Sequence, residues 1–476
     1  MRKTKIVCTL GPASADEKVM ESLLQSGMNV ARLNFSHGSH EQHKIMIDRF
    51  RKVRDRLGLP AAVLLDTKGP EIRLRTFENG GVVLEEAQKF TLTTRDLIGN
   101  QEIVSITYED LPRQLRVGNN LLIDDGHVVL EVESIEESEI HCAVLIGGAL
   151  GDRKGVNVPM VPLDMVYLSE MDKADVLFGI EQNIDFIAAS FVRRAQDVID
   201  MRKFLDYHGG HSIRIIAKIE NLEGVENFDE ILANADGIMV ARGDMGVEVE
   251  YEKLPGLQKR FIRKCYQSGK MVITATQMME SMIQNPYPTR AEITDVANAV
   301  FDGTSAVMLS GESAMGKYPV QAVQKMARIA KQAEKDAFEM GAYRGFTYDV
   351  SSAMTNAICD AACTTAADVH AKAIIAVTKS GQTARSMSKF RPAEPIVAAT
   401  PEERTFHQLS LSWGICPVMA RYQNTSDDLF RHAIDCAKQL DIVQDGDLVV
   451  IAAGIPLNTS GNTNTIKVQQ VGRWEG

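Results

Sequence analysis

Two acidic residues and one lysine stand at the ends of neighbouring apolar runs in the middle of the chain. The run 213–219 contains Lys218 and is followed by Glu220, and the run 237–241 is followed closely by Asp244. Because side chains alternate along a strand, Lys218 and Glu220 point to the same side. Two carboxylates near an ammonium suit Mg2+, which keeps several waters and shares its remaining positions with substrate oxygens. The alternative is a solvated Lys218–Glu220 ion pair, with Asp244 as a helix cap.

These residues belong to a repeating pattern of short apolar runs and helical stretches. Three such units precede residue 70 and five follow residue 168. We expect strands at 3–9, 29–35, 61–67, 185–191, 213–220, 237–244, 271–277 and 306–311. Eight strand–helix units predict an α/β fold of the (β/α)8 TIM barrel type, and an open doubly wound sheet is the alternative. Between the last two strands, Thr289 and Glu292 have the spacing of a helix capping box.

The segment between the third and fourth units has a different pattern. It lacks long amphipathic helices and carries short alternating runs with turns such as Asn79-Gly80-Gly81, which predict a small inserted β-barrel domain. Past residue 345, strands expected at 373–377, 395–399, 417–420, 448–453 and 463–471 predict a C-terminal α/β domain. The predicted domains are 1–69 plus 168–344 for the catalytic barrel, 70–167 for the inserted lid, and 345–476 for the C-terminal domain.

Composition narrows the class of protein. The 476 residues suggest about three domains. With 52 basic and 63 acidic residues, the net charge is 52 − 63 = −11 and the charges are dispersed, which argues against a nucleic-acid or anionic membrane partner. No run reaches the roughly 18 apolar residues of a membrane helix. The N-terminal run is too short for a signal peptide. Seven scattered cysteines without a C-x-x-C pair fit a reducing cytoplasm.

Polar residues concentrate where the predicted strands end. In a (β/α)8 barrel these ends meet at one face, where catalytic side chains lie. The residues gathered there are Arg32, Asn34, Ser36, Asp66, Thr67, Lys68, Ser190, Arg193, Lys218, Glu220, Arg242, Gly243, Asp244, Thr276, Gln277, Ser310 and Glu312. Two acids with several cations, and no Ser-His-Asp or Cys-His set, indicate phosphoryl transfer on an anionic substrate. Asn34, Ser36, Asp66 and Thr67 supply four oxygens for a monovalent cation, although Asn34 and Ser36 alternatively make turns.

The motifs of this face resemble those of the pyruvate kinase family. They include TKIVCTLGPAS, MNVARLNFSHG, LLDTKGPEIR, MVARGD and TATQMMESM, and the resemblance extends over all three predicted domains. It implies a phosphotransferase that moves the phosphoryl group of phosphoenolpyruvate to ADP and yields pyruvate and ATP. It further implies the bacterial, potassium-dependent and effector-regulated type. Glu71 indicates the potassium dependence, because potassium-independent members tend to carry lysine at this position. The chain ends soon after the last strand, so we expect no appended phosphohistidine-type domain.

The resemblance assigns roles to particular residues. Lys218 would stabilise the transferring phosphoryl group, and Arg32 would bind the substrate phosphate. Glu220 and Asp244 would hold Mg2+ or Mn2+. Amides near Gly243, together with Thr276, would bind the substrate carboxylate, and Thr276 with Ser310 would relay a proton to the enolate. The implied potassium ligands are Asn34, Ser36, Asp66 and Thr67, and the implied nucleotide contacts are Arg73, Lys154, Asn34 and His37.

Two polar loops of the C-terminal domain predict regulation. The first loop links a strand to a helix, so its amides lie at a helix N-terminus suited to phosphate; its residues are Thr378, Lys379, Ser380, Gly381, Gln382 and Thr383. The second is 459–465. The resemblance implies a phosphorylated sugar as the effector at this loop and a homotetramer, and an ordinary strand–helix turn is the alternative. The inserted domain is expected to close as a lid over the nucleotide and exclude water, or else to be a rigid decoration.

Two other functions compete with phosphoryl transfer. A Schiff-base aldolase or lyase on the same barrel would use Lys218 as its nucleophile, but that lysine needs a lowered pKa, which the nearby Glu220 opposes. A catalytically silent metabolite sensor would lack a key group, yet Lys218, Glu220, Asp244 and Thr276 are all present.

Overall fold

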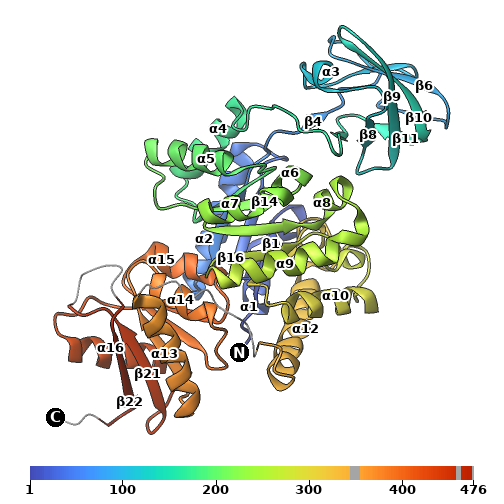
Figure 1. Ribbon diagram of the computed structural model, residues 1–476. Coiled ribbons are helices and arrows are strands. Elements are labelled where there is room, and N and C mark those ends of the chain that lie inside the picture. The colour runs from blue at the N-terminus through green and yellow to red at the C-terminus, as the bar shows by residue number, and fades with distance from the viewer. Residues whose placement is uncertain (344–353, 457–462, 474–476) are drawn as a thin grey trace.

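The computed structural model describes residues 1–343, 354–456 and 463–473, and shows three bodies (Figure 1). A central barrel carries a β-rich domain at one end and an α/β domain near the other. The predicted boundary between residues 344 and 345 lies outside the described residues. The other boundaries stay predictions.

The central body is a closed barrel of eight parallel strands in the order β1-β17-β16-β15-β14-β13-β3-β2. This arrangement confirms the predicted (β/α)8 fold and excludes the open sheet. The strands are β1 Lys5–Thr9, β2 Val30–Asn34, β3 Ala62–Asp66, β13 Phe186–Ala189, β14 Arg214–Ile219, β15 Gly237–Ala241, β16 Met271–Ala275 and β17 Ala306–Leu309. Their side chains are almost all buried, as expected for strands covered on both faces.

Helices surround the barrel, and their buried apolar residues pack on the outer face of its strands to form the main core. They are α1 Glu17–Ser26, α2 His40–Leu57, α4 Glu170–Glu181, α5 Ala195–Tyr207, α6 Leu222–Glu226, α7 Phe228–Asn234, α9 Leu254–Gln267, α10 Arg290–Phe301 and α12 Pro319–Glu339. The predicted capping box is confirmed, because Thr289 Oγ1 accepts the amide of Glu292 while the Glu292 side chain accepts the amide of Thr289.

The predicted end of the sixth barrel strand is wrong. We expected a strand from 237 to 244, but β15 stops at Ala241, and Arg242–Glu248 form the short helix α8. The Arg242 guanidinium donates to the carbonyl oxygens of Ala275 and Thr276, which holds this residue against the next strand's end. Asp244 therefore lies in the first turn of a helix rather than at the end of a strand.

The inserted domain is a curled sheet with the order β4-β12-β8-β9-β10-β6-β7 and its own apolar core. Its strands are β4 Ile72–Arg73, β6 Lys89–Thr93, β7 Ile103–Ser105, β8 Asn120–Ile123, β9 Val128–Glu136, β10 Glu139–Ile146 and β12 Gly155–Asn157, with the separate pair β5 Gly81–Leu84 and β11 Gly148–Gly151 and one short helix, α3 Leu111–Gln114. The Thr107 amide donates to the Arg73 carbonyl (2.9 Å), and the Arg75 amide to the Ser105 carbonyl (2.7 Å). These bonds join the two edges, so the sheet closes on itself.

The C-terminal domain is a five-stranded sheet with the order β20-β19-β18-β21-β22, parallel except for β22. Its elements are α13 Met354–Asp368, β18 Ala373–Val377, α14 Gln382–Lys389, β19 Ile396–Thr400, α15 Glu403–Gln408, β20 Ile415–Met419, α16 Ser426–Gln439, β21 Leu448–Ala453 and β22 Thr465–Gln470. Leu411 of this domain is fully buried in the apolar cluster that fills the barrel interior. The two domains therefore share a core. No helix in the described ranges has the length and apolar character needed to cross a membrane.

Candidate active site

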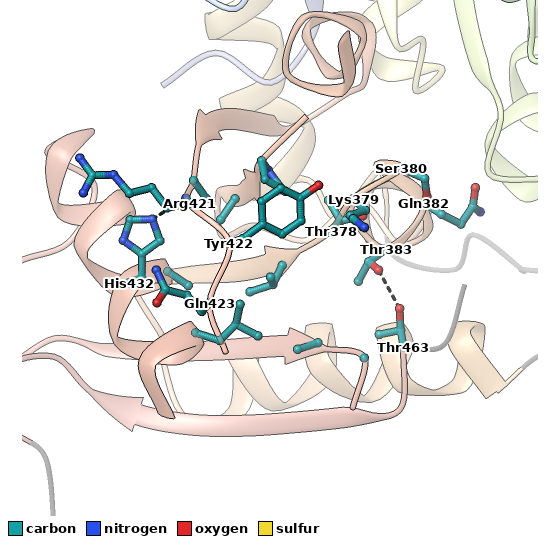
Figure 2. Close-up of a pocket in the computed structure, with 18 of the residues that line it drawn as sticks. Thr378, Lys379, Ser380, Gln382, Thr383, Arg421, Tyr422, Gln423, His432 and Thr463 are labelled. Carbon is teal, nitrogen blue, oxygen red and sulfur yellow. Dashed lines mark hydrogen bonds between the residues drawn. The ribbon is translucent and has the colours of Figure 1, made fainter. Parts of the chain in front are cut away.

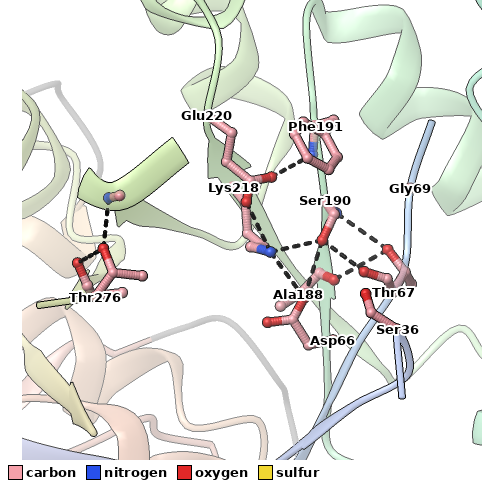
Figure 3. A network of polar contacts seen from close by, with 12 residues as sticks. Ser36, Asp66, Thr67, Gly69, Ala188, Ser190, Phe191, Lys218, Glu220 and Thr276 are labelled. Atoms are coloured by element: carbon pink, nitrogen blue, oxygen red, sulfur yellow. Dashed lines mark hydrogen bonds and ion pairs between the residues drawn. The ribbon is translucent and has the colours of Figure 1, made fainter. Parts of the chain in front are cut away.

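Lys218 lies at the centre of a buried polar network at the barrel's C-terminal face (Figure 3). Its Nζ is 3.0 Å from Asp66 Oδ1, 2.7 Å from Ser190 Oγ and 2.9 Å from Glu220 Oε1. The residues come from β3, the turn after β13, and the end of β14. Parallel strands of a closed barrel bring their carboxyl ends to one face, which is why residues distant in sequence meet here.

A second set of contacts fixes the position of the Asp66 carboxylate. Its Oδ2 accepts a hydrogen bond from Arg32 Nε at 2.6 Å, and another nitrogen of the same guanidinium donates to Thr9 Oγ1 at 2.8 Å. Ser190 Oγ donates to Asp66 Oδ1 at 3.0 Å. Arg32 and Lys218 therefore sit on either side of one carboxylate, and two cations are available at this face to bind an anionic substrate.

The electrostatics of the network differ from group to group. Burial lowers the pKa of Lys218, but Asp66 and Glu220 outweigh it, so the pKa rises and the ammonium stays charged. Burial alone would raise the pKa of Asp66, yet Arg32 and Lys218 bring it below its usual range. For Glu220, burial raises the pKa to about 7, with Asp244 and Asp66 adding to the effect and Lys218 opposing it. Glu220 therefore carries negative charge that its protein neighbours do not fully compensate.

The loop after β16 forms the other side of the site. The Gly243 amide donates to Thr276 Oγ1 at 2.7 Å, and Thr276 Oγ1 in turn donates to the Ala275 carbonyl. Thr276 and Gln277 have φ values of 65° and 52°, a region that non-glycine residues rarely occupy and that is costliest for a β-branched side chain such as threonine. Arg242 holds this backbone, because it donates to the Thr276 carbonyl at 2.6 Å and pairs with Asp295 at 2.7 Å.

Glu220 and Asp244 are the residues that fit a divalent cation. Asp244 raises the pKa of Glu220, which places the two carboxylates within electrostatic reach of each other. Both offer hard oxygen donors, and a divalent cation would compensate their unbalanced charge. Among the described residues, no group of three or more His, Cys, Asp or Glu side chains could hold a metal ion. A site built from two carboxylates leaves the remaining positions to water and substrate.

The four candidate potassium ligands come from adjacent strands. Asn34 and Asp66 are paired in register on β2 and β3. Asn34 Oδ1 accepts the Ser36 amide at 3.2 Å, so the turn we considered is present, and this oxygen still has a second lone pair for a cation. Thr67 Oγ1 accepts the Ser190 amide at 3.1 Å. Figure 3 shows Ser36, Asp66 and Thr67 close together beside Ser190.

A cavity of about 610 Å3 lies between the lid and the barrel. Among its lining residues are His37, Arg73, Lys154, Asp125 and Asp244, so the predicted nucleotide-binding positions other than Asn34 reach one space with a candidate metal ligand. In this structure the side chains of Arg73 and Lys154 already have acidic partners. The Arg73 guanidinium bonds Glu71 at 2.6 and 2.8 Å, and Lys154 Nζ bonds Asp124 at 2.9 Å. Nucleotide phosphates would therefore have to compete with these acids.

Several residues of the site were not predicted. Thr9 binds Arg32, and the Phe191 amide donates to Glu220 Oε2 at 2.6 Å from a backbone with φ of 53°. Asp125 belongs to the inserted domain and lines the cavity. Burial raises the pKa of its carboxyl, and the charge of Asp244 adds to this shift. In the sequence, Asp125 reads only as part of the Asp124-Asp125-Gly126 turn. The predicted partners Thr276 and Ser310 end adjacent strands, but no hydrogen bond joins them in the described part of the chain.

The predicted effector loop lies between β18 and α14, beside a smaller cavity of about 120 Å3 (Figure 2). Five of its six residues line the cavity: Thr378, Lys379, Ser380, Gln382 and Thr383. Gly381 does not; it has φ of 78° and its amide donates to Thr378 Oγ1. Arg421, Tyr422 and His432 come from the opposite side. Thr383 Oγ1 is 2.7 Å from Thr463 Oγ1. Residues 459–462 of the second predicted loop lie outside the described residues.

Comparison with known proteins gives consistent matches over the whole chain. Residues 1–323 match the family model described as "Pyruvate kinase, barrel domain", and residues 356–469 match "Pyruvate kinase, alpha/beta domain". A pyruvate kinase of Staphylococcus haemolyticus is 49% identical over 474 residues, which cover 99% of this chain and 81% of that protein. One from Clostridium acetobutylicum is 47% identical over 479 residues, covering 99% and 100%. A crystal structure of a pyruvate kinase from Cryptosporidium parvum aligns with a TM-score of 0.92 at 39% identity, over 98% of this chain and 96% of that one.

Proposed function

Because the chain belongs to the pyruvate kinase family, we propose that the network around Lys218 and the adjoining cavity transfer the phosphoryl group of phosphoenolpyruvate to ADP, the last step of glycolysis. The observation that supports this placement is the geometry of Lys218, whose ammonium is held by Asp66, Ser190 and Glu220 beside the lid cavity. In the reaction the phosphorus–oxygen bond of phosphoenolpyruvate breaks, the terminal oxygen of ADP bonds to phosphorus, and the enolate that remains takes up a proton.

The charges of the site suit the transition state of this reaction. Negative charge spreads over the three equatorial oxygens of the moving phosphoryl group, and fixed cations stabilise it without reorganising. Lys218 fills this role, because its neighbours keep its pKa raised and its position fixed. Arg32 holds the substrate phosphate, and Gly243 with Thr276 holds the carboxylate. Thr276 and Ser310, with water, deliver the proton to the enolate.

Two kinds of cation complete the proposed site. Glu220 and Asp244 would hold Mg2+ or Mn2+, which supplies electrostatic stabilisation of the substrate oxygens when bound. Asn34, Ser36, Asp66 and Thr67 would hold K+ close to Lys218. Arg73, Lys154 and His37 would bind the nucleotide phosphates as the lid closes and excludes water.

The lyase alternative is disfavoured by the same network. A Schiff-base lysine must lose its proton to act as a nucleophile, whereas the surroundings of Lys218 raise its pKa. Borohydride trapping of a pyruvate adduct on Lys218 would favour the lyase.

A steady-state assay tests both the activity and the potassium site. We expect ATP formation from phosphoenolpyruvate and ADP in potassium buffer with Mg2+, and loss of most of the rate when tetramethylammonium replaces potassium. Tetramethylammonium has no open face for oxygen ligands, so it keeps the ionic strength without filling the site. An unchanged rate after the exchange contradicts the assignment of Asn34, Ser36, Asp66 and Thr67. Absence of ATP formation in any monovalent salt contradicts the function itself.

We further propose regulation by a phosphorylated sugar at the loop 378–383, in a cytoplasmic homotetramer. Lys379 and Arg421 give the cavity positive charge, and the hydroxyls of Ser380 and Thr383 offer donors to a phosphate.

All seven cysteines are free thiols, as expected in a reducing compartment. Light scattering should give a mass about four times the 52.4 kDa of the chain.

Equilibrium binding tests the effector site. A panel of sugar phosphates is titrated into the wild-type protein and into Thr383→Glu, whose carboxylate would repel a phosphate and disrupt the bond to Thr463. We expect an affinity loss of at least tenfold for the sugar phosphate that binds, with unchanged binding of ADP as the control. Equal affinity in both proteins would remove the site from this loop.

A further inference from the structure

A second basic cavity lies between the barrel and the C-terminal domain, and it shares no lining residue with the substrate and effector cavities. It is lined by the turn between α9 and β16, by α14 and the residues after it, and by the segment before β20. Figure 1 shows α14 and α15 on the side of the C-terminal domain that faces the barrel. Four cations line the cavity, namely Lys270, Arg385, Lys389 and Arg391, and none of its described lining residues is acidic.

Two buried polar groups point to a ligand in this cavity. Ser412 and Trp413 both line it and are 2% and 1% exposed. The Ser412 hydroxyl and the Trp413 indole nitrogen have no hydrogen-bond partner within the described residues. Buried polar groups in native proteins nearly always have a partner, and leaving one unsatisfied costs about 1–3 kcal/mol. A hydroxyl and an indole N–H are both donors that an anion could accept from.

The charge of Arg385 is also poorly compensated. Its guanidinium donates to the Ser380 carbonyl at 2.8 Å, and no ion pair of Arg385 is found in the described part of the chain. Burial and the nearby Arg214 lower the pKa of Arg385 to about 9, although Asp236 opposes the shift. Asp236 is already shared, because Arg214 lies 2.8 Å and Arg202 3.1 Å from its oxygens. Asp236 is therefore paired with these two arginines and compensates little of the charge of Arg385.

From these observations we infer that the cavity binds a small inorganic anion, which pins the C-terminal domain to the base of the barrel. Its free volume of about 10 Å3 is at the lower limit for one water-sized group. A chloride ion, which is larger than water, therefore requires a small displacement of the lining side chains, and a phosphate or sulfate requires a slight separation of the domains. A water molecule alone would satisfy Ser412 and Trp413 but would not compensate the charge of Arg385. The inference is independent of the phosphoryl-transfer activity.

The fluorescence of Trp413 can report binding of an anion in this cavity. The chain has two tryptophans, Trp413 and Trp474, so a Trp474→Phe background isolates the emission of Trp413. Chloride, phosphate and sulfate are each titrated as potassium salts against potassium gluconate, which keeps the ionic strength and the potassium concentration constant. We expect a saturable change in Trp413 emission, with the apparent affinity weakened at least tenfold by Arg385→Gln and by Ser412→Ala. Lys372→Gln removes an exposed charge from the same domain and should leave the affinity unchanged.

Each outcome decides the inference. A response to chloride identifies a halide site, a response only to phosphate or sulfate identifies an oxyanion site, and both support anion binding. Absence of a saturable response to all three anions means that the cavity holds water and overturns the inference. A response that survives both cavity substitutions but disappears in Thr383→Glu belongs to the effector cavity and also overturns it. If Arg385→Gln does not fold, Ser412→Ala, which removes a single oxygen, carries the test.

Discussion

Lys218 shows how one side chain depends on the charges around it. An isolated buried lysine loses its proton readily, but Asp66 and Glu220 lie within 3.0 Å of its ammonium and raise its pKa. The positive charge is thus present before substrate arrives. Preorganised charge of this kind stabilises a transition state without the cost of reorienting solvent.

We predict that Lys218→Met lowers kcat by about three orders of magnitude or more, with a much smaller effect on phosphoenolpyruvate binding. Loss of one preorganised charge at the reacting centre typically costs about 10²–10³ in rate, and here it also removes the ammonium that the buried carboxylates of Asp66 and Glu220 share. Steady-state kinetics and equilibrium binding of phosphoenolpyruvate measure the two effects separately. The exposed Lys331→Met is the matched control. Retained turnover in Lys218→Met would refute its assigned role.

At the level of elements, the lid is connected to the barrel by few polar contacts. Asn157 of β12 donates to Glu248 of α8 at 2.9 Å. Arg193, after β13, donates to the carbonyl oxygens of Leu163 and Met165 at 2.7 Å each, on the segment that returns from the lid. The Asp172 carboxylate accepts the Gly69 amide at 2.9 Å where the chain leaves the barrel. These contacts fix the two connections about which a lid would turn.

We predict that Arg193→Met lowers kcat/KM for ADP by about 10- to 100-fold. Each hydrogen bond from a charged donor contributes roughly 1.5–3 kcal/mol, and losing two of them frees the return segment and weakens lid closure. A lid that closes poorly also admits water, so inorganic phosphate should appear without matching ATP. The two products are quantified in the same reaction. Lys203→Met, at an exposed lysine of α5, is the control. Unaltered kinetics in Arg193→Met would contradict the mechanical role of these contacts.

At the scale of the whole molecule, residues of the C-terminal domain are buried in the base of the barrel. Leu411 fills the barrel interior, and Gln408 of α15 donates to the Asp185 carbonyl at 3.1 Å. The Asp185 side chain accepts the Val63 amide at 2.8 Å. Burial raises its pKa to about 6, although the Val63 amide and Arg54 oppose the shift. An ionisable group with a shifted pKa thus sits next to the surface where two domains meet.

The direction of the Asp185 shift sets a pH dependence. Because the folded state binds this proton more tightly than the unfolded chain does, the stabilising contribution is full below pH 3.8 and is lost as the pH rises through about 6. Asp185→Asn cannot ionise, so we predict a higher apparent Tm than wild type at pH 8, by an amount equivalent to roughly 1–3 kcal/mol, with the gap closing towards pH 5. Scanning fluorimetry at both pH values measures it, and the exposed Asp206→Asn is the control. A Tm difference between Asp185→Asn and the wild type that does not change with pH would contradict the raised pKa of Asp185.

The sequence alone determined the pattern of elements and most of the chemistry. Continuous apolar runs with polar ends predicted the eight barrel strands, because the length of an apolar run and the turn residues that follow it are local signals. The motifs around Lys218, Glu220 and Thr276 also placed the chain in its family. Strands of only two or three residues, such as β4 and β12, carry too few residues for such a pattern and were not predicted.

Only the tertiary structure decided how these pieces meet. That Asp244 lies in a helix depends on Arg242 reaching the carbonyl oxygens after β16, a contact between residues more than 30 positions apart. The raised pKa of Glu220, the acid partners of Arg73 and Lys154, and the basic cavity beside Trp413 all arise from burial and from charges brought together by folding. Such effects depend on distance in space, which local residue patterns do not encode.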